Sequence, residues 1–181
     1  AYAGIYVQEG GQVYVGDIAI NGFEVGIGVR NGGLLRTIGD VSIANVNTGI
    51  SMQSGSFRGA NNISINAVDH ALQLDVNSSW QGWGSALTIA QGHIAIDNGS
   101  SISGSEILAP NSEINIYHSV LNASGVTSNT LRANGSMVTL TNSSFSGEVV
   151  SEHNAKVEFY DSPLNNVNVH QNSSFIYPTR E

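Results

Sequence analysis

Four side chains carry the combination of carboxylates and imidazole that acid–base chemistry would need. Asp69-His70 is followed closely by Asp75, and Asp97 comes 22 residues after Asp75. If the chain wound into coils of about 22 residues, the carboxylates of Asp75 and Asp97 would lie close together on neighbouring coils. A glycosidase needs two carboxylates at a set separation across one bond, and a polysaccharide lyase would need clustered acids for Ca²⁺ together with a base.

The alternative is that these acids are turn residues and solvated strand faces. We favour it because the remaining acidic residues are scattered singly along the chain. We therefore assign no catalytic residues and lean towards a protein that is not an enzyme. If it is one, Asp69, His70, Asp75 and Asp97 are the candidates.

Metal and cofactor sites are not indicated. No histidine lies at close metal-ligand spacing with another, so a zinc site would need several to converge across coils. These histidines are His70, His93, His118, His153 and His170. The glycine-rich string over residues 26–33 lacks the lysine and the helix of a phosphate-binding loop. We predict no metal and no cofactor.

Trp83 is the single residue that most resembles a contact for a partner. It lies between Gly82 and Gly84 in an expected loop, whereas Trp80 occupies a position that the strand pattern assigns to the core. An exposed tryptophan can stack on a sugar ring or anchor a protein partner. We therefore predict Trp83 as the binding residue.

Composition excludes several classes of partner. Charged residues make up only 11% of the chain, against a usual share of about 25%. The net charge is −8 at pH 7 and no basic cluster is visible along the sequence, which argues against nucleic acid and anionic membrane surfaces. The chain has no cysteine and no apolar stretch long enough for a transmembrane helix.

Short period-two runs recur throughout the chain and predict its fold. Four of them follow one another at similar intervals: Ile94-Ala95-Ile96, Ile114-Asn115-Ile116, Val138-Thr139-Leu140 and Val157-Glu158-Phe159. Alternation of apolar and polar residues indicates strands, which are too short to be stable unless each stacks on a copy of itself. We predict an all-β, single-stranded right-handed parallel β-helix of roughly eight coils of about 20 residues.

The same pattern predicts where the chain turns. Asn, His or Asp follows several of these runs, and residues of this kind tolerate the left-handed backbone of a tight bend. These are Asn45, Asn98, His118, Asn142 and Asp161. A bend repeated in each coil would place them in register. Residues 81–85, and residues 122–134 within the wider interval between Ile114 and Val138, are expected to be protruding loops.

The sequence pattern of these coils resembles that of a known family. Gly4-Ile5-Tyr6-Val7-Gln8, Gly49-Ile50-Ser51-Met52-Gln53, Leu74-Asp75-Val76-Asn77-Ser78-Ser79-Trp80 and the run over residues 135–147 look like coils of bacterial autotransporter passenger domains, especially pertactin-like ones. The resemblance implies a cell-surface or secreted virulence factor of a Gram-negative bacterium with an adhesive role. The coils are also similar to those of phage tailspikes and pectate-lyase-like secreted enzymes.

We expect one domain over residues 1–181, cut from a longer surface protein. The favoured function is a non-enzymatic extracellular module for adhesion or binding of a host protein or glycan. The alternative is a phage tailspike or secreted β-helix enzyme that binds or cleaves polysaccharide. Oligomerisation stays open, because a trimeric tailspike and a monomeric passenger domain share this coil pattern.

Overall fold

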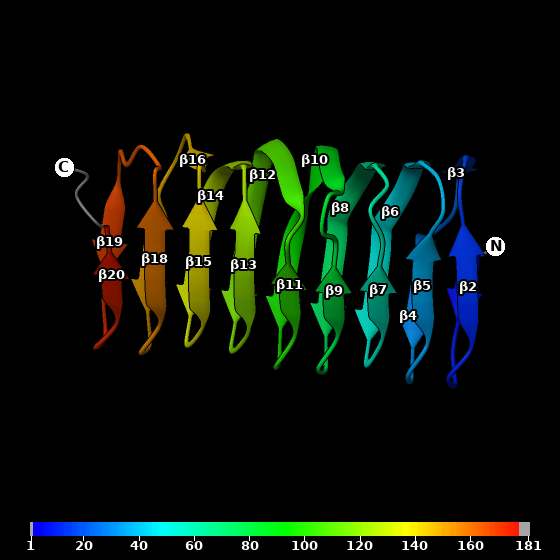
Figure 1. Ribbon diagram of the computed structural model, residues 1–181, viewed down its shortest axis with the longest axis horizontal. Helices are drawn as coiled ribbons and strands as arrows, with labels where there is room; N and C mark the ends of the chain where they lie inside the picture. Colours follow the sequence, from blue (N-terminus) through cyan, green and yellow to red (C-terminus); the bar gives the residue numbers. More distant parts are fainter. Residues whose placement is uncertain (1, 178–181) are drawn as a thin grey trace.

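The computed structural model describes residues 2–177; residue 1 and residues 178–181 of the expected domain lie outside the described residues. Short parallel strands lie side by side along one long axis and form a rod (Figure 1). Within residues 2–177 the regular secondary structure consists only of β-strands, which form two parallel sheets. The predicted all-β parallel solenoid of about eight coils is confirmed. No helix that could span a membrane occurs in this part of the chain.

The two sheets divide the strands between them. The first sheet contains β1 (Ala3–Val7), β3 (Ile18–Asn21), β4 (Val25–Arg30), β6 (Val41–Gln53), β8 (Ile63–Asp75), β10 (Ala86–Asp97), β12 (Glu106–Tyr117), β14 (Val126–Asn134), β16 (Ser144–Phe145), β17 (Val149–Glu152) and β19 (Val167–Val169). The second sheet contains β2 (Gln12–Val15), β5 (Leu34–Thr37), β7 (Ser56–Arg58), β9 (Ser79–Gln81), β11 (Ser101–Ser103), β13 (Val120–Ser124), β15 (Met137–Thr141), β18 (Lys156–Tyr160) and β20 (Ser174–Ile176).

Most coils have three strand segments, because the long strands of the first sheet bend. In β6 the register shifts between Ala44 and Thr48; the earlier half pairs with β3 and the later half with β4. We call the later halves the first face, the second sheet the second face and the earlier halves the third face. The first corner joins the first and second faces, the second corner joins the second and third, and the third corner closes the coil.

Inward side chains form apolar columns along the rod. On the second face one column runs from coil to coil with every pair in register. Its members are Leu35, Phe57, Trp80, Ile102, Leu121, Val138 and Val157, all at most 1% exposed. The rings of Phe57 and Trp80 stack with their centroids 3.9 Å apart. Burial of each such side chain contributes about 1.5–3 kcal/mol.

The core positions follow the prediction, but the phase of the repeat does not. The paired residues of each run, such as Ile94 with Ile96 and Val138 with Leu140, are buried. However, Ile114 belongs to the first face and Val138 to the second, and the true partner of Ile114 is Leu131. The interval between Ile114 and Val138 is therefore long because the two residues lie on different faces, and not because a loop is inserted between equivalent positions. The loop predicted over residues 122–134 is wrong, because β13 and β14 fill most of it.

The predicted turn residues all have the left-handed conformation, with φ from 46° to 54°. They lie at different corners, however. Asn45 is at the third corner, where its amide donates to Asn21 Oδ1 at 3.0 Å. Asn98 and His118 are at the first corner, and Asn142 and Asp161 at the second. The prediction that these residues adopt the left-handed conformation is confirmed, whereas the prediction that all five lie in register is wrong.

Buried serines connect successive coils at the corners. At the first corner the backbone N–H of Ser78 donates to Ser100 Oγ, Ser100 N–H to Ser119 Oγ and Ser119 N–H to Ser136 Oγ, at 3.1–3.2 Å. The hydroxyls of Ser119 and Ser136 donate in turn to carbonyls of their own coils, at 2.8 Å. Each of these two hydroxyls thus accepts from a buried N–H of the preceding coil and donates to a carbonyl of its own coil.

Candidate functional site

The acid–base candidates of the sequence lie on neighbouring strands. His70 Nδ1 is 3.1 Å from Asp69 Oδ2 on β8. Leu74 pairs with Ile96, so Asp75 and Asp97, which follow them, lie at one level on adjacent coils. Burial raises the pKa of Asp97, the Asp75 carboxylate raises it further, and His70 acts in the opposite direction.

Asp75 also has a structural task in its turn. Its Oδ1 accepts hydrogen bonds from the Val76 N–H at 2.9 Å and from Asn98 Nδ2 at 2.7 Å. These bonds stabilise the first corner where the chain leaves β8. Among residues 2–177 no three His, Asp or Glu side chains converge to hold a metal ion. A catalytic role for the four candidates stays a prediction.

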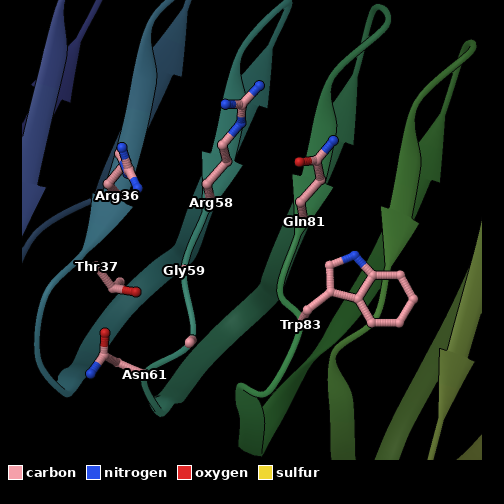
Figure 2. Close-up of a pocket in the computed structure, with 8 residues that line it drawn as sticks. Arg36, Thr37, Arg58, Gly59, Asn61, Gln81 and Trp83 are labelled. Carbon is pink, nitrogen blue, oxygen red and sulfur yellow. The ribbon is translucent and has the colours of Figure 1, made fainter.

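Trp83 lies elsewhere, at the second corner, in the turn between β9 and β10. The turn closes with a hydrogen bond from Ser85 N–H to the Gly82 carbonyl at 3.0 Å, and Gly84 has a φ of 79°. The tryptophan side chain is 65% exposed. It lines a hollow of about 360 Å³ (Figure 2). The hollow, called the Trp83 hollow below, is formed by Arg36, Thr37, Arg58, Gly59, Ala60, Asn61, Gln81 and Trp83.

The next coil holds the indole in place. A Cβ atom at Gly104 would overlap indole Cδ2, so the ring packs directly on the backbone there. The turn is anchored from beneath by a buried network. Trp80 Nε1 donates to Ser105 Oγ at 2.9 Å, and Ser105 Oγ lies 3.1 Å from Ser85 Oγ. An aromatic surface fixed in this way loses little conformational entropy on binding.

A row of outward side chains leads along the second face to the tryptophan turn. Tyr14 pairs with Arg36, Arg36 with Arg58 and Arg58 with Gln81, and the last three side chains point outward on successive strands (Figure 2). We call these four residues the basic column. Neighbouring members have Cα atoms about 4.8 Å apart. The Arg36 guanidinium lies 5.7 Å from the centre of the Tyr14 ring.

Within residues 2–177 Arg36 and Arg58 form neither an ion pair nor a side-chain hydrogen bond, whereas each of the other described lysine and arginine residues forms one or the other. Arg132 pairs with Glu152, Lys156 pairs with Glu158, and Arg30 donates to Ser51 Oγ. Within residues 2–177 no carboxylate pairs with Arg36 or Arg58, and the described lining of the hollow contains no acidic residue. Like charges on directly paired residues of neighbouring strands are unfavourable, and a bound anion would offset that repulsion.

The floor of the Trp83 hollow contains an unsatisfied hydroxyl. Thr37 is only 8% exposed, and its Oγ1 has no hydrogen-bond partner within the described chain. A Cβ atom at Gly59 would overlap this oxygen, so the hydroxyl occupies space that only glycine leaves free. Ser112 Oγ is likewise without a partner, but it does not line the hollow. A buried polar atom without a partner is costly, and because Gly59 covers this oxygen, a ligand in the hollow does not reach it.

Sequence reasoning predicted that Trp83 lies in an exposed turn, but it did not predict the residues around it. Arg36, Arg58 and Gln81 are far apart along the chain, where they do not form a basic cluster. The fold nevertheless places Arg36 and Arg58 on adjacent strands, with Gln81 on the next, because one coil separates each residue from the next. Assigning each strand to its face would have placed the three side chains together.

The site therefore rests on the geometry of this chain alone. A comparison with models of protein families, with curated proteins and with solved structures gives no match.

Proposed function

We propose that this protein is a non-enzymatic binding module whose rigid rod presents the Trp83 hollow to an extracellular glycan. The observation that carries the proposal is the exposed indole, held flat on Gly104 at the edge of a hollow lined by amides and guanidinium groups. Aromatic rings stack on the apolar faces of sugars while amides bond the hydroxyls.

Binding is favoured over catalysis at this corner because the hollow lacks the groups that chemistry would need. Hydrolysis of a glycosidic bond uses a carboxylic acid and a second carboxylate, and the described lining of the hollow has neither. Guanidinium groups and amides do not titrate near neutral pH. They can orient a ligand but cannot transfer its protons.

The setting we propose is the surface of a bacterial cell or its surroundings, as in an autotransporter passenger domain. The low content of charged residues and the resemblance of the coils to such domains support this setting. In it, the rod serves adhesion: it extends away from the cell and displays the second corner to host glycans. A host protein is the other partner class that an exposed tryptophan would suit.

The test is an array of polysaccharides incubated with the pure protein, read for retained protein and for newly released reducing ends. We expect binding without release, and we expect Trp83→Ala to abolish the binding. Tyr117→Ala is the matched control, because Tyr117 is an exposed aromatic residue at the first corner. Binding that survives Trp83→Ala, or an array with no signal, would contradict the proposal and turn the search to host proteins.

A second candidate function, polysaccharide cleavage, is favoured by the pair at the first corner. Asp75 and Asp97 lie on adjacent coils, and the raised pKa of Asp97 is what a general acid beside a second carboxylate requires. Its test is the release of new sugar ends in the same array. Asp97→Asn and Asp75→Asn should each abolish the release, while Trp83→Ala would leave the bond-breaking step intact.

A further inference from the structure

We infer that the ligand of this site is an acidic polysaccharide, whose anionic groups bind Arg36 and Arg58 while a sugar ring stacks on Trp83. The inference rests on the proposed function, which it deepens by naming the class of glycan. It is carried by the two arginines, which the fold places side by side without a counter-ion in the described chain.

The charge of the surroundings makes this pair unusual. The chain has a net charge of −8, yet its second corner presents two cations with no acid in the described lining of the hollow. The pair therefore selects an anion at a surface that otherwise repels anions. A guanidinium group binds a carboxylate or sulfate through two parallel hydrogen bonds, which adds direction to the attraction.

The geometry of the basic column favours a polymer over a small anion. Tyr14 and Gln81 lie on either side of the arginine pair, one coil away in each direction, and the tryptophan turn follows Gln81. From Tyr14 to Gln81 the column spans three coil steps, about 14 Å. Sites repeated at a constant spacing suit a chain whose units each carry one acidic group. Such a chain would run parallel to the rod, with aromatic rings near both ends of its contact.

The experiment measures binding of oligogalacturonate, its methyl ester and neutral dextran by titration calorimetry. We expect oligogalacturonate to bind, and the uncharged ester and dextran to bind on the order of tenfold more weakly or worse. At about 1 M NaCl, where the screening length is roughly 3 Å, the preference for the acid should shrink. Dextran sulfate tests whether sulfate can replace carboxylate at the same pair, and equal dependence on the arginines is expected for both anions.

Variants locate the interaction. Arg36→Gln/Arg58→Gln should weaken oligogalacturonate binding on the order of tenfold or more. Arg132→Gln/Lys156→Gln is the matched control, because it also removes two positive charges but takes them from ion pairs away from the hollow. It should change the affinity for oligogalacturonate by no more than about twofold.

Other outcomes would overturn the inference. If dextran or the methyl ester binds as well as the acid, and Trp83→Ala still abolishes binding, the proposed function stands and the acidic class is wrong. If no saccharide binds, both fail together. If poly-glutamate or single-stranded DNA binds as tightly as oligogalacturonate, with the same dependence on Arg36 and Arg58, the site recognises anions and not an acidic sugar.

Discussion

The second corner is built differently in the two halves of the rod. After the first coil, whose turn between the second and third faces uses residues 16–17, the corresponding turns of the N-terminal half use residues 38–40, 59–62 and 82–85. In the C-terminal half they use residues 104–105, residue 125 and residues 142–143. The coils also shorten towards the C-terminus, so register partners on the second face lie farther apart along the chain before Ile102 than after it. The partners are Val13, Leu35, Phe57, Trp80 and Ile102, then Leu121, Val138, Val157 and Phe175.

Polar groups differ between the halves in the same way. In the C-terminal half the hydroxyls of Ser143 and Ser162 at this corner are bonded, and Lys156 is paired with Glu158. In the N-terminal half Arg36, Arg58 and the Thr37 hydroxyl have no such partners within the described chain. The short corners show that one or two residues are enough to close a coil. The longer corners add Asn61 and Trp83, which line the hollow beside the two unpaired arginines of β5 and β7.

The largest effect is expected at a fully buried core position of the short coils. Leu140→Asp places an unpaired charge in a fully buried column between Ala123 and Phe159. We expect a loss of more than about 4 kcal/mol in the free energy of unfolding, measured by urea melts. Thr139→Asp, on the outward side of the same strand, is the matched control. Asn142→Ala should cost about 1 kcal/mol, as a change at a left-handed turn position. A small effect of Leu140→Asp would mean that the register assigned to β15 is wrong.

Removing one serine hydroxyl at the first corner should cost less, but clearly more than a surface change. Ser119→Ala removes the Oγ acceptor of the Ser100 N–H, which then keeps only its bond at 3.3 Å to the Asp97 carbonyl. Loss of one hydrogen bond in buried surroundings should cost about 1 kcal/mol. The check is a thermal melt beside Ser124→Ala, which removes an exposed serine from the next strand of the second face. Equal melting temperatures for the two variants would show that the serine column does not hold the coils together.

Removing a buried hydroxyl at the hollow should raise the free energy of unfolding, whereas removing the Ser119 hydroxyl should lower it. Thr37→Val removes a buried hydroxyl that has no partner within the described chain, so it should stabilise the free protein by up to about 1 kcal/mol. Urea melts of Thr37→Val and Ser119→Ala, compared with the parent protein, would then shift in opposite directions. A destabilising Thr37→Val would remove the contrast between the two halves, because it would mean that the hydroxyl already has a partner in the free protein.

The sequence was sufficient for the architecture because strand alternation and turn chemistry are local. Ile94, Ile96 and the left-handed Asn98 could each be recognised from their neighbours in the chain. The face on which a strand lies is not local: Ile-x-Ile on the first face and Val-x-Leu on the second have the same pattern. That ambiguity hid the arginine pair, and it produced the loop wrongly predicted over residues 122–134. Buried serines were missed because serine in an Asn- and Ser-rich chain also suits an exposed turn.

The smallest effect concerns the acidic counterpart of the arginine pair. Asp75 and Asp97 are like charges one coil apart at the first corner, and burial together with Asp75 raises the pKa of Asp97. The folded protein therefore holds this proton more tightly than the unfolded chain. Between about pH 4 and the raised pKa, stability falls as pH rises, and the penalty is complete above the raised value.

Asp97→Asn removes this charge and breaks no side-chain hydrogen bond of Asp97 within the described chain. It should stabilise the protein at neutral pH by less than about 1 kcal/mol, because solvent screens a partly exposed pair. The gain should vanish below about pH 4, where the parent carboxyl is also protonated. Melting temperatures of both proteins across this pH range provide the measurement. A constant difference at all pH values would mean that packing and not charge separates them. The acid pair would then lose the electrostatic coupling on which its candidacy for catalysis depends.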